Sequence, residues 1–155
     1  MSLFNKGINE RKVWLASNEH DVLKEADAVQ TALLFHEDWH ISKQEEYVYR
    51  FHHQQLPLLK PNQISISGVK LVREEEDVIA IAFLRNSLEK PIRFEVVNIL
   101  LVDGSGRALA KKAFDLSVLG EVPARSSIAW QFLFEEHDRL TELIPEDWQI
   151  VFEWT

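Results

Sequence analysis

The residues best suited to chemistry lie in one short stretch, where His36, Glu37 and His40 have the His-Glu-x-x-His spacing of zinc-dependent proteases. That chemistry requires a helix, because two histidines four residues apart must share one face to bind zinc while the glutamate acts as general base. Here a strand-like segment precedes the motif, and a separate helix is predicted to begin after Ser42. The local context therefore argues against a zinc site.

The longer form of the zinc motif fails as well, since Lys43 and Glu46 stand where its glycine and third histidine would be. A glutamate ligand from elsewhere in the chain would still be compatible with a metal. We expect an ordinary loop, with Trp39 and Ile41 connecting the strand to the helix and packing into the core. A zinc-dependent hydrolase using His36 and His40 remains the least favoured alternative.

Other catalytic chemistry has little support in the sequence. The chain has no cysteine, which excludes disulfides, thiol catalysis and cysteine-ligated zinc. There is no Gly-x-Ser-x-Gly elbow, no P-loop and no Gly-x-Gly-x-x-Gly loop. His52 and His53 fall near the end of the predicted helix, where a cation is favourable, and His137 lies in a polar stretch without an evident partner. We therefore expect no enzyme activity, no metal and no cofactor.

The charge of the chain limits its partners. The sequence has 25 acidic and 17 basic residues, a formal charge of −8, and its basic residues are scattered. Nucleic acid and anionic membrane both require clustered Lys and Arg, so neither is an expected partner. The longest apolar run, residues 78–84, is too short to cross a bilayer, and the N-terminus has no signal-peptide core. We expect a cytoplasmic protein.

Large apolar residues alternate near the C-terminus, at Trp148, Ile150, Phe152 and Trp154. This spacing places all four side chains on one face of a β-strand, and residues 130–134 repeat the pattern. The simplest interpretation is that these faces are buried in a β-sandwich or small barrel. The alternatives are an exposed aromatic face for sugars, or a strand at a sheet edge where a partner strand adds; the last strand is our candidate for such an edge.

One amphipathic helix is predicted over residues 43–55. Ser42 and Glu45 match a capping box, in which each side chain satisfies a backbone donor at the start of a helix. Tyr47, Val48 and Phe51 follow at helical spacing, and Pro57 comes directly after the element.

The rest of the chain has the pattern of strands and turns. We expect a β-bulge at Gly68, a hairpin turn at residues 74–77 and a central strand, apolar on both faces, at 78–84. Further strands are predicted at 29–35, 64–71, 91–102, 107–116, 128–134 and 148–154, with a loop at 120–127 and a helical turn within 138–144. The fold class is mainly β: an immunoglobulin-like antiparallel sandwich of about seven strands with one N-terminal helix. Residues 1–28 form a polar extension and 29–155 a single domain.

Several motifs, in order and spacing, resemble the SLAP domain of Gram-positive bacteria over roughly residues 29–154. They include the segments 34–42, 45–48, 56–68, 83–87, 114–116, 123–127 and 130–132. The resemblance implies a small domain linked with accessory Sec secretion and S-layer assembly, with no catalytic residues. It also implies structural roles: Pro61 and Gly68 for a turn and bulge, and Phe83, Trp130 and Phe132 for the core.

From this resemblance we expect a non-catalytic protein-interaction module that binds secretion machinery or an exported precursor. The domain would act as a monomer or homodimer. A cell-wall carbohydrate-binding module is the first alternative, and it would require exposed, coplanar Trp or Tyr rings.

Overall fold

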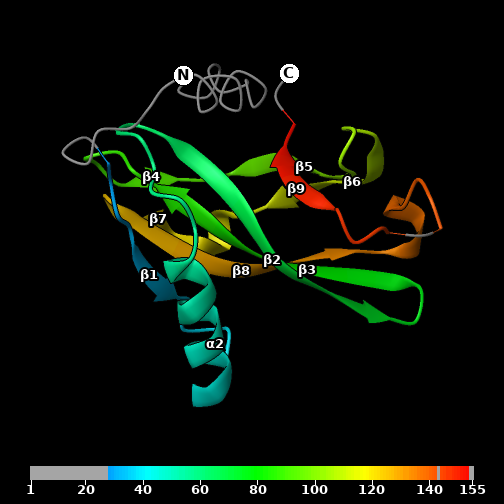
Figure 1. The fold of residues 1–155 in the computed structure, drawn as a ribbon, viewed down its shortest axis with the longest axis horizontal. Coiled ribbons are helices and arrows are strands. Elements are labelled where there is room, and N and C mark those ends of the chain that lie inside the picture. The colour runs from blue at the N-terminus through cyan, green and yellow to red at the C-terminus, as the bar shows by residue number, and fades with distance from the viewer. Residues whose placement is uncertain (1–27, 143, 154–155) are drawn as a thin grey trace.

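A computed structural model describes residues 28–142 and 144–153, so Trp154 of the predicted last strand lies outside the described residues. The described chain is mainly β with one α-helix, as predicted (Figure 1). Its elements are β1 (Ala32–Phe35), α2 (Lys43–Gln54), β2 (Ile64–Glu74), β3 (Asp77–Asn86), β4 (Ile92–Arg93), β5 (Val96–Val102), β6 (Ala108–Asp115), β7 (Glu121–Val122), β8 (Ser126–Phe134) and β9 (Gln149–Phe152).

The strands form three sheets. One has the order β1-β8-β3-β2, a second pairs β4 with β7, and the third has the order β6-β5-β9. Contrary to the antiparallel prediction, the largest sheet is mixed, because β1 runs parallel to β8 while the other pairs are antiparallel. Strand β1 is separated from β8 by most of the chain, so no hairpin turn imposes an antiparallel direction on it. Among the described residues no helix has the length and apolar character needed to span a membrane.

The main core lies between the four-stranded and three-stranded sheets, the two layers visible in Figure 1. Phe132 and Phe134 of β8 are fully buried there, and Phe114 of β6 contacts both rings edge-on. From the third sheet, Phe152 stacks on Phe94. The aromatic ladders therefore face inward where they are described, as the simplest interpretation of the sequence predicts.

Strand β3 is the predicted central strand and is buried on both faces. Its even-numbered residues, from Val78 to Leu84, point into the main core. Its odd-numbered residues Ile81 and Phe83 belong to a second, smaller apolar cluster beneath α2. We call this region, between α2 and the outer face of the four-stranded sheet, the outer layer.

The predicted bulge at Gly68 is confirmed, since the pairing of β2 with β3 shifts register between Gly68 and Lys70. A Cβ atom at Gly68 would lie 2.6 Å from the ring of Trp148, which packs over this position. Glycine is therefore needed here for the close approach of Trp148.

Three boundaries differ from the predictions. The single strand expected at 91–102 is divided into β4 and β5, because Phe94 between them turns into the core and is only 2% exposed. The expected loop at 120–127 contains the short strand β7, which pairs with β4. The helical turn predicted within 138–144 lies earlier, as a 3₁₀ turn at Glu136–Asp138.

Candidate functional site

The His-Glu-x-x-His stretch lies in the loop between β1 and α2, as predicted from its context. Both ring nitrogens of His36 are engaged: Nε2 donates to the carbonyl of Val118 at 3.0 Å, and Nδ1 accepts from the backbone N–H of Asp38 at 3.0 Å. His40 is exposed on the same loop. A histidine with both nitrogens used has none to offer a metal, so this arrangement is structural.

Trp39 anchors the same loop, as predicted. Its ring stacks on Tyr49 of α2 at 5.8 Å between centroids and meets Trp130 of β8 edge-on at 6.3 Å. His36 also contacts Trp130, at 5.4 Å. The loop thus holds α2 against the sheet.

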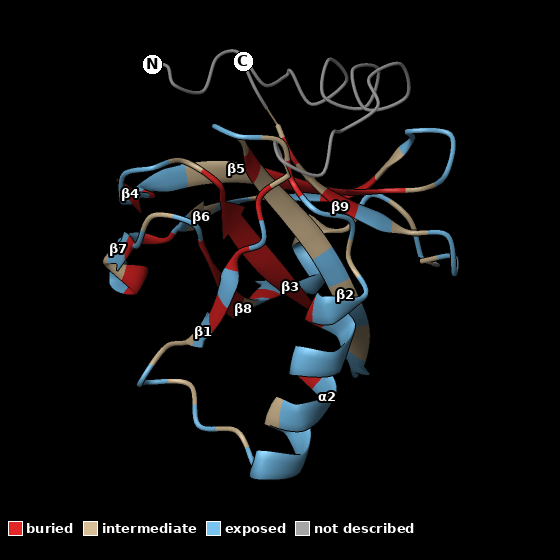
Figure 2. Ribbon diagram, turned by 60° about the vertical axis from the view of Figure 1, so that its left-hand side comes forward, coloured by how far each residue is buried: buried red, intermediate tan, exposed pale blue. Residues whose placement is uncertain are grey.

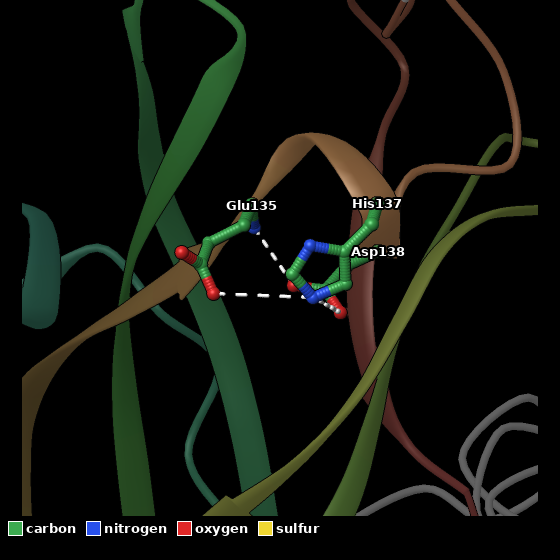
Figure 3. A group of neighbouring side chains, drawn as sticks. All are labelled: Glu135, His137 and Asp138. Atoms are coloured by element: carbon green, nitrogen blue, oxygen red, sulfur yellow. Dashed lines mark hydrogen bonds and ion pairs between the residues drawn. The ribbon is translucent and has the colours of Figure 1, made fainter.

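One other group of potential metal ligands occurs among the described residues: Glu135, His137 and Asp138 (Figure 3). The lack of an evident partner for His137 in the sequence was misleading, because its Nε2 lies 3.5 Å from Asp138 and 4.0 Å from Glu135. Lys112 already places its ammonium 3.6 Å from each of the two carboxylates. Asp138 also accepts the backbone N–H of Glu135 at 2.8 Å. The group forms a turn cap in which one ammonium is shared by the two carboxylates.

The outer layer combines apolar residues with buried polar and charged side chains beneath helix α2. Helix α2 begins at the predicted capping box, where Ser42 accepts from the N–H of Glu45 and the Glu45 carboxylate accepts from the N–H of Ser42. Its buried face, however, consists of Tyr49 and His53 rather than Tyr47, Val48 and Phe51. The predicted helix is confirmed, and the apolar residues at helical spacing are not the ones that it buries.

Four polar side chains gather under the C-terminal end of α2, and we call them the outer polar cluster: Thr31, His53, Arg85 and Ser127. Each is 7% exposed or less. The Thr31 and Ser127 hydroxyls lie 2.6 Å apart, and His53 Nε2 lies 3.1 Å from Ser127 Oγ and 3.2 Å from Thr31 Oγ1. Arg85 is paired in register with Ser127 across β3 and β8. Four segments distant in sequence therefore meet at one place.

His53 is neutral in this environment. Burial, together with the positive charges of Arg85 and Arg50, lowers its pKa from 6.5 to about 4. Its ring also packs edge-on against Phe83 at 5.1 Å. The sequence-based interpretation of His53 as a cation at the helix end is therefore wrong, because the side chain turns into the apolar layer instead of toward solvent.

The pair of Ser127 and His53 has the elements of a nucleophile and its base, yet its setting opposes catalysis. Ser127 is fully buried, and a base with a pKa near 4 is a poor proton acceptor at neutral pH. Among the described residues no carboxylate is bonded to His53 to orient it, as a triad requires. These groups satisfy one another as a buried hydrogen-bond network.

Arg85 is less well satisfied. One amino group, Nη2, donates to the carbonyl of Pro57 at 2.7 Å. Its Nε is buried and has no hydrogen-bond partner. Burial lowers the pKa of Arg85 from 12.5 to about 10, which leaves the guanidinium charged at neutral pH.

The outward side of α2 exposes an apolar row. Tyr47 is 72% exposed, Phe51 52% and Val48 42%. The first two stand one turn apart on the side opposite Tyr49, and Figure 2 shows that most of the helix surface is exposed. We call Tyr47, Val48 and Phe51 the α2 apolar row.

The candidate edge residues at the C-terminus are partly described. Strand β9 is the terminal strand of its sheet, as the edge prediction requires. Ile150 and Phe152 are 3% and 4% exposed, and Trp148 is half-buried over Gly68. Their side chains are thus part of the core, and binding of a partner strand at β9 stays a prediction.

Comparison with known proteins gives one match: the family model described as the SLAP domain covers residues 33–154. No curated protein matches the chain. No solved structure matches it either.

Proposed function

The chain belongs to the SLAP domain family, which is associated with accessory Sec secretion, and on this premise we propose that it is a non-catalytic protein-interaction module. It would act in the secretion of surface proteins by binding secretion machinery or an exported precursor. The proposal places the domain in the cytoplasm, as a monomer or homodimer, and takes the arrangement of its sheets as immunoglobulin-like.

The observation that carries this proposal is the α2 apolar row. Helix α2 buries Tyr49 and His53 against the sheet and still presents Tyr47, Val48 and Phe51 to solvent. Grouped exposed apolar side chains are typical of protein contact surfaces, and Tyr and Phe are enriched in such contacts. A row at one-turn spacing fits a partner segment that lays apolar side chains along the helix.

Charge indicates the chemistry of that partner segment. The chain has a formal charge of −8, and the loop and first turn leading into the row carry exposed Glu37, Asp38 and Glu45. We therefore propose a polypeptide segment with apolar residues beside Lys or Arg, since opposite charges steer association and suppress unsuitable partners. The described tryptophans Trp39, Trp130 and Trp148 are all half-buried, which gives the carbohydrate alternative no exposed indole platform.

The proposal is tested by affinity capture with matched variants. Tyr47→Lys combined with Phe51→Lys places two charges in the row, whereas Val96→Lys places one charge at an exposed apolar position on β5 that is 66% exposed. We expect an identified secretion component or exported precursor to be retained by the native chain and by Val96→Lys. Its recovery should fall about tenfold or more with the double variant. Equal recovery by all three chains would rule out the row as the contact surface.

Deletion of the last strand is not a suitable test of the alternative edge at β9. Ile150 and Phe152 are buried, so truncation before Trp148 would open the main core and unfold the domain. Hydrogen–deuterium exchange on the captured complex distinguishes the two surfaces without a deletion. Protection confined to residues 149–152 would move the contact from α2 to β9.

A further inference from the structure

Two arginine side chains are buried in the described residues, and their surroundings differ. The side chain of Arg139 is 8% exposed, and its guanidinium donates to the carboxylate of Glu76 at 3.0 Å and to the carbonyl of Glu142 at 3.0 Å. Arg85 is 5% exposed and donates only to the carbonyl of Pro57. Both leave Nε without a partner. Only Arg139 therefore has a counter-charge.

Among the residues that the structure describes, no group around Arg85 supplies the missing negative charge. His53 is neutral, Thr31 and Ser127 bond to His53 and to each other, and the nearby cation Arg50 is paired with Glu46 at 2.9 Å. The C-terminal end of α2 contributes only the partial negative charge of its carbonyl groups. Burial of a charge without a counter-ion is costly, so this arrangement needs a physical reason beyond a single bond to Pro57.

The tip of Arg85 lies close to the protein surface. Its one acceptor, the carbonyl of Pro57, belongs to the segment that follows α2, where Gln55, Pro57 and Leu58 are exposed. The unsatisfied Nε is thus near a surface loop, not at the centre of the molecule.

We propose that Arg85 is the anchor of an anion site that takes a carboxylate entering beneath the segment 55–58. A guanidinium presents parallel N–H groups that match the two oxygens of a carboxylate. A singly charged carboxylate balances one guanidinium, whereas phosphate carries about −1.5 to −2 and would need a second cation, which Arg50 cannot supply while it is paired with Glu46. That the ligand is a carboxylate does not depend on the proposed function. That the carboxylate belongs to a partner protein does rest on the proposed function.

The test is a titration of the intact, ¹⁵N-labelled chain with sodium acetate, read by NMR at the arginine Nε–H signals. Sodium chloride at equal ionic strength is the reference. We expect the Arg85 Nε–H signal to shift with a saturating dependence on acetate and not on chloride. The Arg139 Nε–H signal, from an arginine that already has its carboxylate, should remain in place under both salts. A linear shift shared by both arginines, or no shift at Arg85, would overturn the site.

Two further arms sharpen the result. Arg85→Lys keeps the positive charge and loses the parallel N–H groups of the guanidinium. The Arg85 Nε–H signal is absent from this variant, so the readout is the backbone amide signals of residues 53–58. These signals should lose their saturating response to acetate. A retained response there would place the binding elsewhere. Inorganic phosphate saturating at a lower concentration than acetate would overturn the carboxylate assignment. Acetate binding needs no partner protein, so its failure and failure of the capture experiment are separate results.

Discussion

The two faces of strand β3 carry different kinds of residue. The face toward the three-stranded sheet presents apolar side chains from Val78 to Leu84, and at the same parity it ends in Asn86, a buried neutral amide that donates to surrounding backbone carbonyls. The face beneath α2 begins in the same way with Ile81 and Phe83, and then ends in the buried charge of Arg85. A strand needs apolar residues on both faces to be central in a layered fold, and nothing in that requirement calls for an arginine.

This difference between the two faces distinguishes the region that stabilises the fold from the region available for binding. The main core is a closed apolar volume whose residues can be exchanged for others of similar size at modest cost. The outer layer is smaller, lies under a single helix and accommodates four buried polar groups. We infer that stability resides mainly in the main core and that the outer layer is the part that can adapt to a ligand or partner.

The largest expected effect compares equivalent aromatic residues of the two layers. Phe132→Ala should lower the free energy of unfolding by about 3–5 kcal/mol, because the ring is fully buried in the main core against Phe114. Phe83→Ala in the outer layer should cost less, about 2–3 kcal/mol, since α2 can settle into the space. Urea denaturation of both variants measures the difference. Equal losses would mean that the two layers are equally rigid.

The next effect is the pH dependence of stability caused by His53. Its pKa is near 4 in the folded chain against 6.5 when unfolded, so between these values the unfolded chain binds a proton that the folded chain does not. The free energy of unfolding should therefore fall as the pH drops from 6.5 to 4, by about 3 kcal/mol from this group.

His53→Gln is the control for that measurement, because it keeps a hydrogen-bonding side chain and does not titrate. Denaturant unfolding of both chains across this pH range, taken as a difference, removes the contribution of the carboxylates. If the difference in free energy of unfolding between the two chains stays constant with pH, the pKa of His53 is not lowered in the folded chain. The outer layer would then admit water to its ring.

A smaller and opposite pair of effects is expected from the two buried arginines. Arg85→Met should raise the free energy of unfolding by about 1 kcal/mol, since it removes an unpaired buried charge at the loss of one hydrogen bond. Arg139→Met should lower it by about 1 kcal/mol, because that arginine bonds to Glu76 and Glu142. Thermal unfolding measures both. A large destabilisation by Arg85→Met would indicate that the arginine stabilises the fold through its hydrogen bond to the carbonyl of Pro57.

Much of this architecture follows from local patterns in the sequence. The capping box at Ser42, the bulge at Gly68 and the doubly apolar run of β3 each depend on a few neighbouring residues, and all three predictions are confirmed. The parallel pairing of β1 with β8 depends on contacts between distant segments, which no local pattern encodes. The same limit explains the division of residues 91–102, where burial of Phe94 overrides a continuous strand pattern.

The outer polar cluster was missed for the same reason. Thr31, His53, Arg85 and Ser127 are each unremarkable in their own segment and acquire meaning only when β1, α2, β3 and β8 meet. One local signal was available: Arg85 directly follows the run 78–84, which is apolar at every position, and it has the parity of Phe83. A charge at that parity predicts a buried arginine, provided that the strand is recognised as buried on both faces.

The smallest expected effect concerns the two sides of α2. Tyr47→Lys and Phe51→Lys should change the free energy of unfolding by no more than about 0.5 kcal/mol, because both rings are exposed in the folded chain. Tyr49→Ala, on the buried side of the same helix, should cost about 3 kcal/mol through loss of its contacts with Phe35 and Trp39. Denaturant unfolding of the three variants supplies the comparison. A side that contributes nothing to stability is free to make the partner contact that we propose, whereas destabilisation by Tyr47→Lys would show that the row helps to hold the fold.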